Sequence, residues 1–129
     1  MILRNDTYVQ EAEEVIKKLA SKTDRNGRSQ MVTTSKIRNL LSMTNEIYNE
    51  VRTSREEKLN EDIRGQINYL KIRFVYEAGR DQQVKDFVEI ARILPCIDEI
   101  RESREQYLLF GRYMEALVAY HRYYGGKDK

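Results

Sequence analysis

The chain has 129 residues, of which 34% are charged and 40% hydrophobic, and these values are typical of one globular domain. Its 23 basic and 21 acidic residues leave a net charge of only +2. This argues against a free-standing protein that coats DNA, because such a protein needs many phosphate contacts. One proline and six glycines leave long uninterrupted segments. The sequence therefore predicts an all-α fold, a compact single-domain bundle of about five helices over residues 1–129.

The single cysteine, Cys96, excludes an internal disulfide bond, and its apolar neighbours Pro95 and Ile97 favour a buried, unreactive thiol. The first residues lack the apolar core of a signal peptide, and no run of about 18 apolar residues occurs in the sequence. We therefore expect a cytoplasmic protein that has no membrane partner.

The first predicted helix follows a cap at Asp6 or Thr7 and ends near Ser21. Val9 is expected on its inward face. The polar segment at residues 22–32 contains an Asn-Gly turn signal, so we interpret it as a mobile loop.

The second predicted helix begins at Thr33 or Thr34, whose hydroxyl can cap it, and its apolar face extends to Val51. Lys36 and Arg38 lie in its first turns, at opposite edges of that face. A helix N-terminus exposes unpaired N–H groups and the positive end of the helix dipole, so backbone and side chains together could bind a phosphate here. The alternative is an ordinary helix cap with exposed charges.

A charged connection at residues 53–60 leads to the third predicted helix, which runs from Asn60 or Glu61 to Ala78. Gly79 is expected to end it in a left-handed conformation.

This third helix has two distinct faces when it is drawn at 100° per residue. One face alternates aromatic rings with cations, and its members fall within about 60° of one another. The alternation suits a phosphate backbone with stackable bases, because cations meet phosphates and rings meet base faces. The alternative is an ordinary solvated face. The stripe consists of Tyr69, Arg73, Tyr76 and Arg80, and the apolar face of Ile63, Ile67, Leu70, Phe74 and Ala78.

Asp81 is expected to cap a fourth helix that ends before Pro95, because the residue before a proline avoids helical backbone angles. Ile97 and Ile100 begin a further helical segment. It either breaks near residues 102–103 or continues into the last helix.

The last predicted helix ends at Gly125-Gly126, before a loose tail at residues 126–129. It mixes rings with cations, and we expect its tyrosines to pack against the bundle while their hydroxyls reach water. Contact with a neighbouring subunit is the alternative. The members of this cluster are Arg112, Tyr113, Tyr120, Arg122, Tyr123 and Tyr124.

The sequence lacks the residue patterns of common catalytic and cofactor sites. His121 is the only histidine, so neither a zinc site nor a Ser-His-Asp triad has the residues it needs, and we expect a structural role for this side chain. No phosphate-binding glycine loop occurs. We therefore predict a non-enzyme without a catalytic residue, a metal or another cofactor.

Three segments carry a resemblance to a known family: TTSKIRNLL at residues 33–41, YLKIRFVYEAGR at 69–80 and RYMEALVAYH at 112–121. In this order they resemble the small subunit of the type III-A CRISPR effector, the Csm complex. The resemblance extends from about Thr33 to Gly126. The first 30 residues add little to it.

The resemblance implies a helical bundle that works inside an RNA-guided complex in antiviral defence. Copies of the subunit would line the inner face of this complex, beside the backbone and large Csm subunits. They would contact the backbone of target RNA paired to CRISPR RNA without reading its sequence. Catalysis would belong to other subunits.

Basic positions within the resembling segments are the expected RNA contacts, and one polar and one aromatic residue are added from the helix faces. Lys71 points about 160° away from Arg73 on an ideal helix, so the two are expected to serve different surfaces. The expected RNA-binding residues are Lys36, Arg38, Asn45, Lys71, Arg73, Tyr76 and Arg80.

Two other functions are compatible with parts of the sequence. A purely structural helical adaptor would use every charged stripe for protein contacts and would not touch RNA. A helix-turn-helix regulator would need a short turn after the second helix, and the connection at residues 53–60 is too long and acidic for that.

Overall fold

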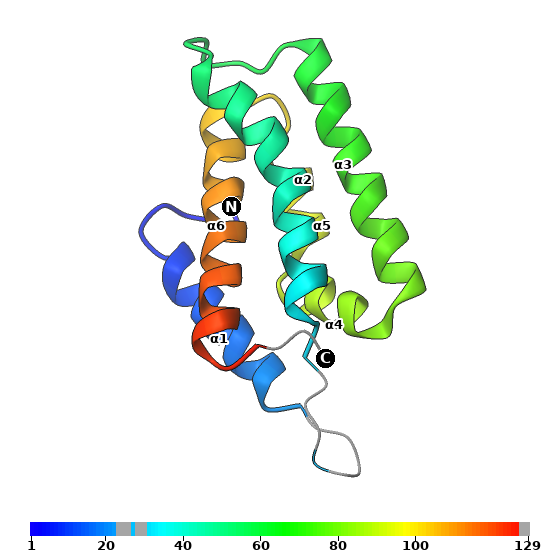
Figure 1. Ribbon diagram of the computed structural model, residues 1–129. Helices are drawn as coiled ribbons and strands as arrows, with labels where there is room; N and C mark the ends of the chain where they lie inside the picture. Colours follow the sequence, from blue (N-terminus) through cyan, green and yellow to red (C-terminus); the bar gives the residue numbers. More distant parts are fainter. Residues whose placement is uncertain (23–26, 28–30, 127–129) are drawn as a thin grey trace.

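The computed structural model describes residues 1–22, 27 and 31–126, and these residues form six helices and no extended strand (Figure 1). The sequence-based expectation of an all-α bundle is thereby confirmed. Five helices have nine or more residues, in agreement with the expected number, and one helix of six residues is added to them. The helices are α1 (Tyr8–Ala20), α2 (Thr34–Thr53), α3 (Glu61–Arg80), α4 (Gln82–Ile90), α5 (Ile93–Asp98) and α6 (Arg104–Tyr123).

Helix α6 forms the centre of the bundle and packs against α1, α2 and α5. Its buried side chains Tyr107, Phe110, Met114 and Leu117 belong to one hydrophobic cluster that includes residues from all six helices. Gly111 permits the close approach of α2, because a Cβ at this position would lie 2.3 Å from the Tyr48 ring.

Helix α3 lies at the edge of the bundle and runs antiparallel to α2 (Figure 1). The end of α3 packs against α4, and α5 lies against its inner side. The connection from α2 is held at Leu59, whose N–H donates to the Glu102 carbonyl at 2.8 Å. This position leaves one long side of α3 open to solvent.

The start of α2 agrees with the predicted cap, and α3 begins where it was predicted to begin, although its cap at Asn60 was not among the predictions. The side chain of Thr33 accepts from the N–H of Lys36 at the start of α2, and that of Asn60 accepts from Ile63 at the start of α3. At the start of α1, in contrast, Thr7 makes no side-chain cap hydrogen bond.

The predicted end of the third helix at Gly79 is wrong. Gly79 lies within α3 without a positive φ angle, and the helix continues through Arg80 to a stop at Asp81. The Asp81 carboxylate accepts from the N–H groups of Gln83 and Val84, so the same residue ends α3 and caps α4. The helix therefore ends at the strong cap of Asp81, two residues after the glycine that was expected to end it.

The fourth helix is shorter than expected. It ends at Ile90, after which Arg92 adopts a left-handed conformation with φ of 55°. Pro95 lies inside the first turn of α5, where no N–H is required of it, so it begins a helix instead of ending one. A break near residues 102–103 is confirmed, because Ser103 caps α6 there.

Three further positions can be compared with the predictions. Val9 is exposed, so its expected inward orientation is wrong. Helix α6 ends at Tyr123, and Gly125 has a φ angle of 90°, in agreement with the predicted stop. Most of the predicted loop at residues 22–32 lies outside the described residues, and so do residues 127–129 of the predicted tail. Val32, at the end of the predicted loop, is described and is buried.

Candidate nucleic-acid interface

The two faces predicted for α3 are present. Phe74 and Leu70 are buried on the inner face, and Phe74 makes an edge-to-face contact with Phe110 of α6. On the outer face Tyr69 and Tyr76 are exposed to solvent at 62% and 54%. Because α3 remains helical through Arg80, the predicted stripe of rings and cations is continuous along its second half.

The cations of this stripe share one carboxylate. Arg73 Nη2 lies 2.8 Å from Glu77 Oε2, and Arg80 Nη1 lies 3.6 Å from Glu77 Oε1. Both guanidinium groups also lie over the Tyr76 ring, at 5.3 Å and 5.7 Å from its centroid. These cation–π contacts and ion pairs orient both arginines along one surface.

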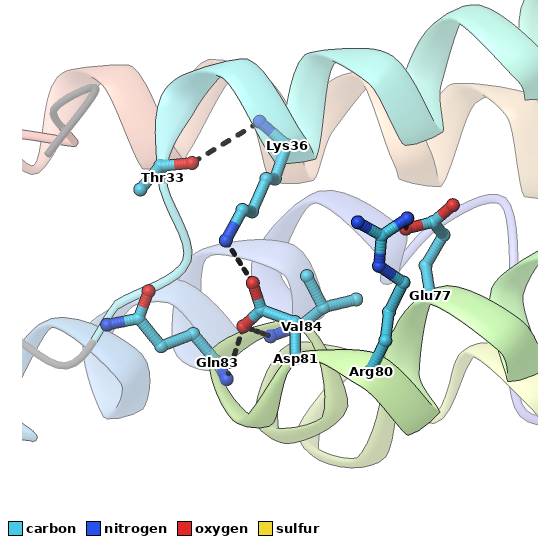
Figure 2. Close-up of polar contacts among 7 residues, drawn as sticks. All are labelled: Thr33, Lys36, Glu77, Arg80, Asp81, Gln83 and Val84. Atoms are coloured by element: carbon cyan, nitrogen blue, oxygen red, sulfur yellow. Dashed lines mark hydrogen bonds and ion pairs between the residues drawn. The ribbon is translucent and has the colours of Figure 1, made fainter.

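A third cation joins this surface from α2. Lys36 Nζ forms an ion pair with Asp81, directly beside the Arg80–Glu77 pair (Figure 2). A groove of about 350 Å³ lies between the start of α2 and the end of α3, and Lys36, Asn39, Glu77 and Arg80 are among the residues that line it. We call Lys36, Arg73, Tyr76 and Arg80 the α2–α3 cationic surface.

The charges of this surface are largely compensated by acids of the same chain. The pKa of Asp81 is lowered, first by its hydrogen bond from Lys36 and also by the N–H groups at the start of α4, although partial burial opposes this shift. On this surface the three cations Lys36, Arg73 and Arg80 face the two carboxylates of Glu77 and Asp81. The remaining positive charge is therefore local and small.

Arg38 and Asn45 do not lie on this surface. Ile47 marks the side of α2 that faces α3, because it lines the groove between the two helices. Arg38 and Asn45 lie about 160–180° from Ile47 around an ideal helix axis. Arg38 is exposed and forms no ion pair with any residue in the described part of the chain, whereas Asn45 is half-buried.

Lys71 also faces a different side. Its Nζ lies 2.6 Å from Asp98 Oδ1 of α5, and both residues line a groove between α3 and α5. The predicted separation of Lys71 from Arg73 is thus confirmed in the structure. The seven expected RNA-binding residues consequently fall on three surfaces rather than one.

The tyrosine cluster of α6 is only partly as expected. Tyr113 is buried, and its hydroxyl donates to the Ala91 carbonyl at 2.9 Å, so the predicted access of this hydroxyl to water is wrong. Tyr124 stacks on Tyr120 and donates to Glu13 Oε2 at 2.6 Å. Tyr123 remains exposed.

Cys96 is buried, as predicted, and His121, for which a structural role was expected, is buried as well. His121 Nε2 lies 2.6 Å from the Val32 carbonyl, and burial lowers the pKa of the imidazole. Burial raises the pKa of the Cys96 thiol to about 12. Within residues 1–22, 27 and 31–126, no group of three or more His, Cys, Asp or Glu side chains could hold a metal ion.

Comparison with known proteins identifies the family. The family model described as Csm2 Type III-A matches residues 10–127. This chain belongs to the type III-A Csm2 family. The resemblance drawn from the sequence is therefore confirmed.

Relatives from several bacteria carry the name CRISPR system Cms protein Csm2. One from Streptococcus thermophilus is 46% identical over 127 residues, which cover 98% of each chain. One from Mycobacterium tuberculosis is 41% identical over 129 residues, which cover the full length of both chains. One from Enterococcus italicus is 36% identical over 120 residues, which cover 88% of this chain and 86% of that protein. No helix in the described residues combines the length and hydropathy needed to cross a membrane.

Three residues of the candidate site were not selected from the sequence. Asn39 lines the groove beside Lys36, and it lies within the segment TTSKIRNLL that carries the resemblance. Glu77 was detectable from its spacing of four residues from Arg73. The pairing of Asp81 with Lys36 depends on how the junction of α3 and α4 lies beside the start of α2, and no local pattern indicates it.

Proposed function

We propose that this Csm2 family member is the non-catalytic small subunit of a type III-A CRISPR complex and that its α2–α3 cationic surface contacts an RNA backbone. The RNA would be target RNA paired to CRISPR RNA along the inner face of the complex. The observation that carries the proposal is the convergence of Lys36 from α2 with Arg73 and Arg80 from α3 on one side of the bundle.

The chemistry of this surface suits a phosphate backbone. Each guanidinium has five N–H donors, and Glu77 occupies only part of this capacity on Arg73 and Arg80. The Arg80 guanidinium is exposed, and exposed ion pairs contribute only about 0–1 kcal/mol, so a phosphate oxygen can replace the carboxylate there at low free-energy cost. The exposed Tyr76 ring can stack on a base of any identity, which does not require sequence readout.

The small residual charge indicates weak binding by one copy. Guide pairing reads the target sequence in an RNA-guided complex, so the protein needs to supply only a few backbone contacts. Copies of the chain, held in a row by contacts with other Csm subunits, would multiply these contacts through effective concentration. We therefore expect feeble RNA binding by the isolated protein and stable engagement in the assembly.

The purely structural adaptor remains a second candidate, and a specific observation favours it. Lys36, Lys71 and Arg73 each pair with a carboxylate of the same chain. Under this alternative the Lys36–Asp81 and Lys71–Asp98 pairs hold helices together, the Arg73–Glu77 pair stabilises α3, and all three remain closed in the assembled complex. Arg38, which forms no ion pair with any residue that the structure describes, would then be one basic residue available for a neighbouring subunit.

Substitutions in the reconstituted complex distinguish the two functions. Arg73→Ala and Arg80→Ala should leave assembly unchanged and weaken the retention of target RNA. For each lost phosphate contact, the slope of the logarithm of the binding constant against the logarithm of the salt concentration should become shallower by about 0.7. Arg55→Ala is the matched control, because Arg55 is exposed on the α2–α3 connection, away from this surface. Arg38→Ala and Lys71→Ala test the other two surfaces in the same assay. Normal retention by every variant would support the adaptor.

A further inference from the structure

A second groove lies between α2 and the first half of α3, away from the Lys36–Asp81 end of the cationic surface. Its volume is about 540 Å³. Met43 and Ile47 of α2 and Leu70 of α3 form its apolar lining, and the exposed ring of Tyr69 stands at its edge. Arg73, already paired with Glu77, marks the boundary with the cationic surface.

Acidic side chains surround this apolar lining. Glu46, Glu61 and Asp62 line the groove, and none of them forms an ion pair with any residue that the structure describes. Glu50 joins this group through Gln66, whose Nε2 donates to Glu50 Oε2 at 2.9 Å and to Asp62 Oδ2 at 3.1 Å. The acids of the cationic surface are neutralised by bases of the same chain, but these acids are not.

Gly65 lies in the wall of the same groove, in the interior of α3. A Cβ here would meet no atom of the chain within 4 Å, so internal packing does not require the glycine. A glycine within a helix is destabilising by about 1 kcal/mol relative to alanine. Its absent side chain widens the groove and permits another backbone to approach α3 closely.

We propose that this groove docks a polypeptide segment of a different protein chain, one that presents an apolar side chain flanked by lysine or arginine. The apolar side chain would enter between Met43 and Leu70, and the basic residues would neutralise Glu46 and Asp62. RNA is disfavoured because its phosphates would meet unpaired carboxylates. Two copies of this chain docked groove to groove are disfavoured because their carboxylates would face one another. The inference does not depend on RNA binding by the cationic surface.

A photo-crosslinking residue placed at Glu46 tests the identity of the occupant. The variant is assembled into the reconstituted complex with CRISPR RNA and target RNA, irradiated and analysed by mass spectrometry. The proposal requires a crosslink to a segment of another Csm subunit that carries lysine or arginine beside the crosslinked residue. Crosslinks to RNA, to a second copy of this chain or to an acidic segment, or no crosslink at all, would overturn it.

Two substitutions with matched controls test the geometry and the charge. Gly65→Leu should preserve or raise the thermal midpoint of the isolated protein but reduce its incorporation into the complex by about tenfold, which corresponds to roughly 1.4 kcal/mol. Gly79→Leu is the control, because Gly79 lies in α3 outside the groove and also has open space around it. Glu46→Lys should likewise impair incorporation, whereas Glu56→Lys on the α2–α3 connection should not. Normal incorporation of both Gly65→Leu and Glu46→Lys would overturn the proposal.

Discussion

Lys36 near the start of α2 forms an ion pair with Asp81, the residue that separates α3 from α4 (Figure 2). This pair joins three helices at one point and places a cation of α2 beside Arg80. Asp81 also caps α4, because its other carboxylate oxygen accepts hydrogen bonds from the N–H groups of Gln83 and Val84. The cap and the ion pair can be separated by mutation.

We expect the cap of Asp81 to matter more for stability than its ion pair. Asp81→Ala should lower the free energy of unfolding by about 1–2 kcal/mol, because it removes both functions. Lys36→Met should lower it by less than about 1 kcal/mol, since the pair is exposed. Urea unfolding monitored by circular dichroism measures both values. A larger effect of Lys36→Met than of Asp81→Ala would show that the pair dominates.

The lowered pKa of Asp81 also predicts a dependence on acid. The folded protein keeps this carboxylate ionised at pH values where the unfolded chain binds a proton. The stabilisation is therefore fully present above the ordinary aspartate pKa of about 3.9 and is lost as the pH falls through the lower folded value. The Asp81→Ala variant should lack this part of the acid transition.

His121 should make stability fall as the pH drops below neutrality. Burial lowers the pKa of its imidazole, so the unfolded chain binds a proton more readily than the folded one. The stabilisation is fully present above the ordinary histidine pKa of about 6.5 and is lost as the pH falls through the folded value.

Urea midpoints at pH 8 and pH 5, compared with those of His121→Gln, measure this effect. Glutamine keeps a donor that can reach the Val32 carbonyl, but it does not titrate. The change in urea midpoint between pH 8 and pH 5 should be smaller in His121→Gln than in the unsubstituted protein. Equal pH dependence in both proteins would assign the effect to other groups.

The two faces of α3 should respond differently to truncation. Phe74→Ala should lower the free energy of unfolding by about 3–5 kcal/mol, because it leaves a cavity beside Phe110. Ile72→Ala, at a side chain that is 60% exposed, should change it by less than about 0.5 kcal/mol. Thermal and urea unfolding of both variants measure the contrast. A large effect at Ile72 would mean that the open side of α3 is covered in the isolated protein.

Local sequence patterns were sufficient to predict most helices and several of their caps. The caps at Thr33 and Asp81 depend on a short side chain and the first N–H groups of the same helix, so they could be predicted. The predictions drawn from Gly79 and Pro95 were wrong because each residue type is compatible with two positions in a helix. A glycine is tolerated inside a helix that packs well elsewhere, and a proline is tolerated in a first turn.

The candidate site was predicted less completely. The stripe from Tyr69 to Arg80 lies on one helix, so its periodicity was enough to find it. The separation of Arg38 and Asn45 from that stripe could not be predicted, because it depends on which side of α2 packs against α3. The burial of Tyr113 depends in the same way on the position of α4.

The sequence by itself determined the all-α class and the set of cations on each helix, because these follow from periodicity and helix caps, and three ordered segments carried the resemblance to the family. Only the tertiary structure decided which cations meet, which carboxylates neutralise them and which acids remain unpaired. The pairs Lys36–Asp81 and Lys71–Asp98 join residues far apart in the chain. Such contacts act over a few ångströms, and helix packing alone brings their partners within that distance.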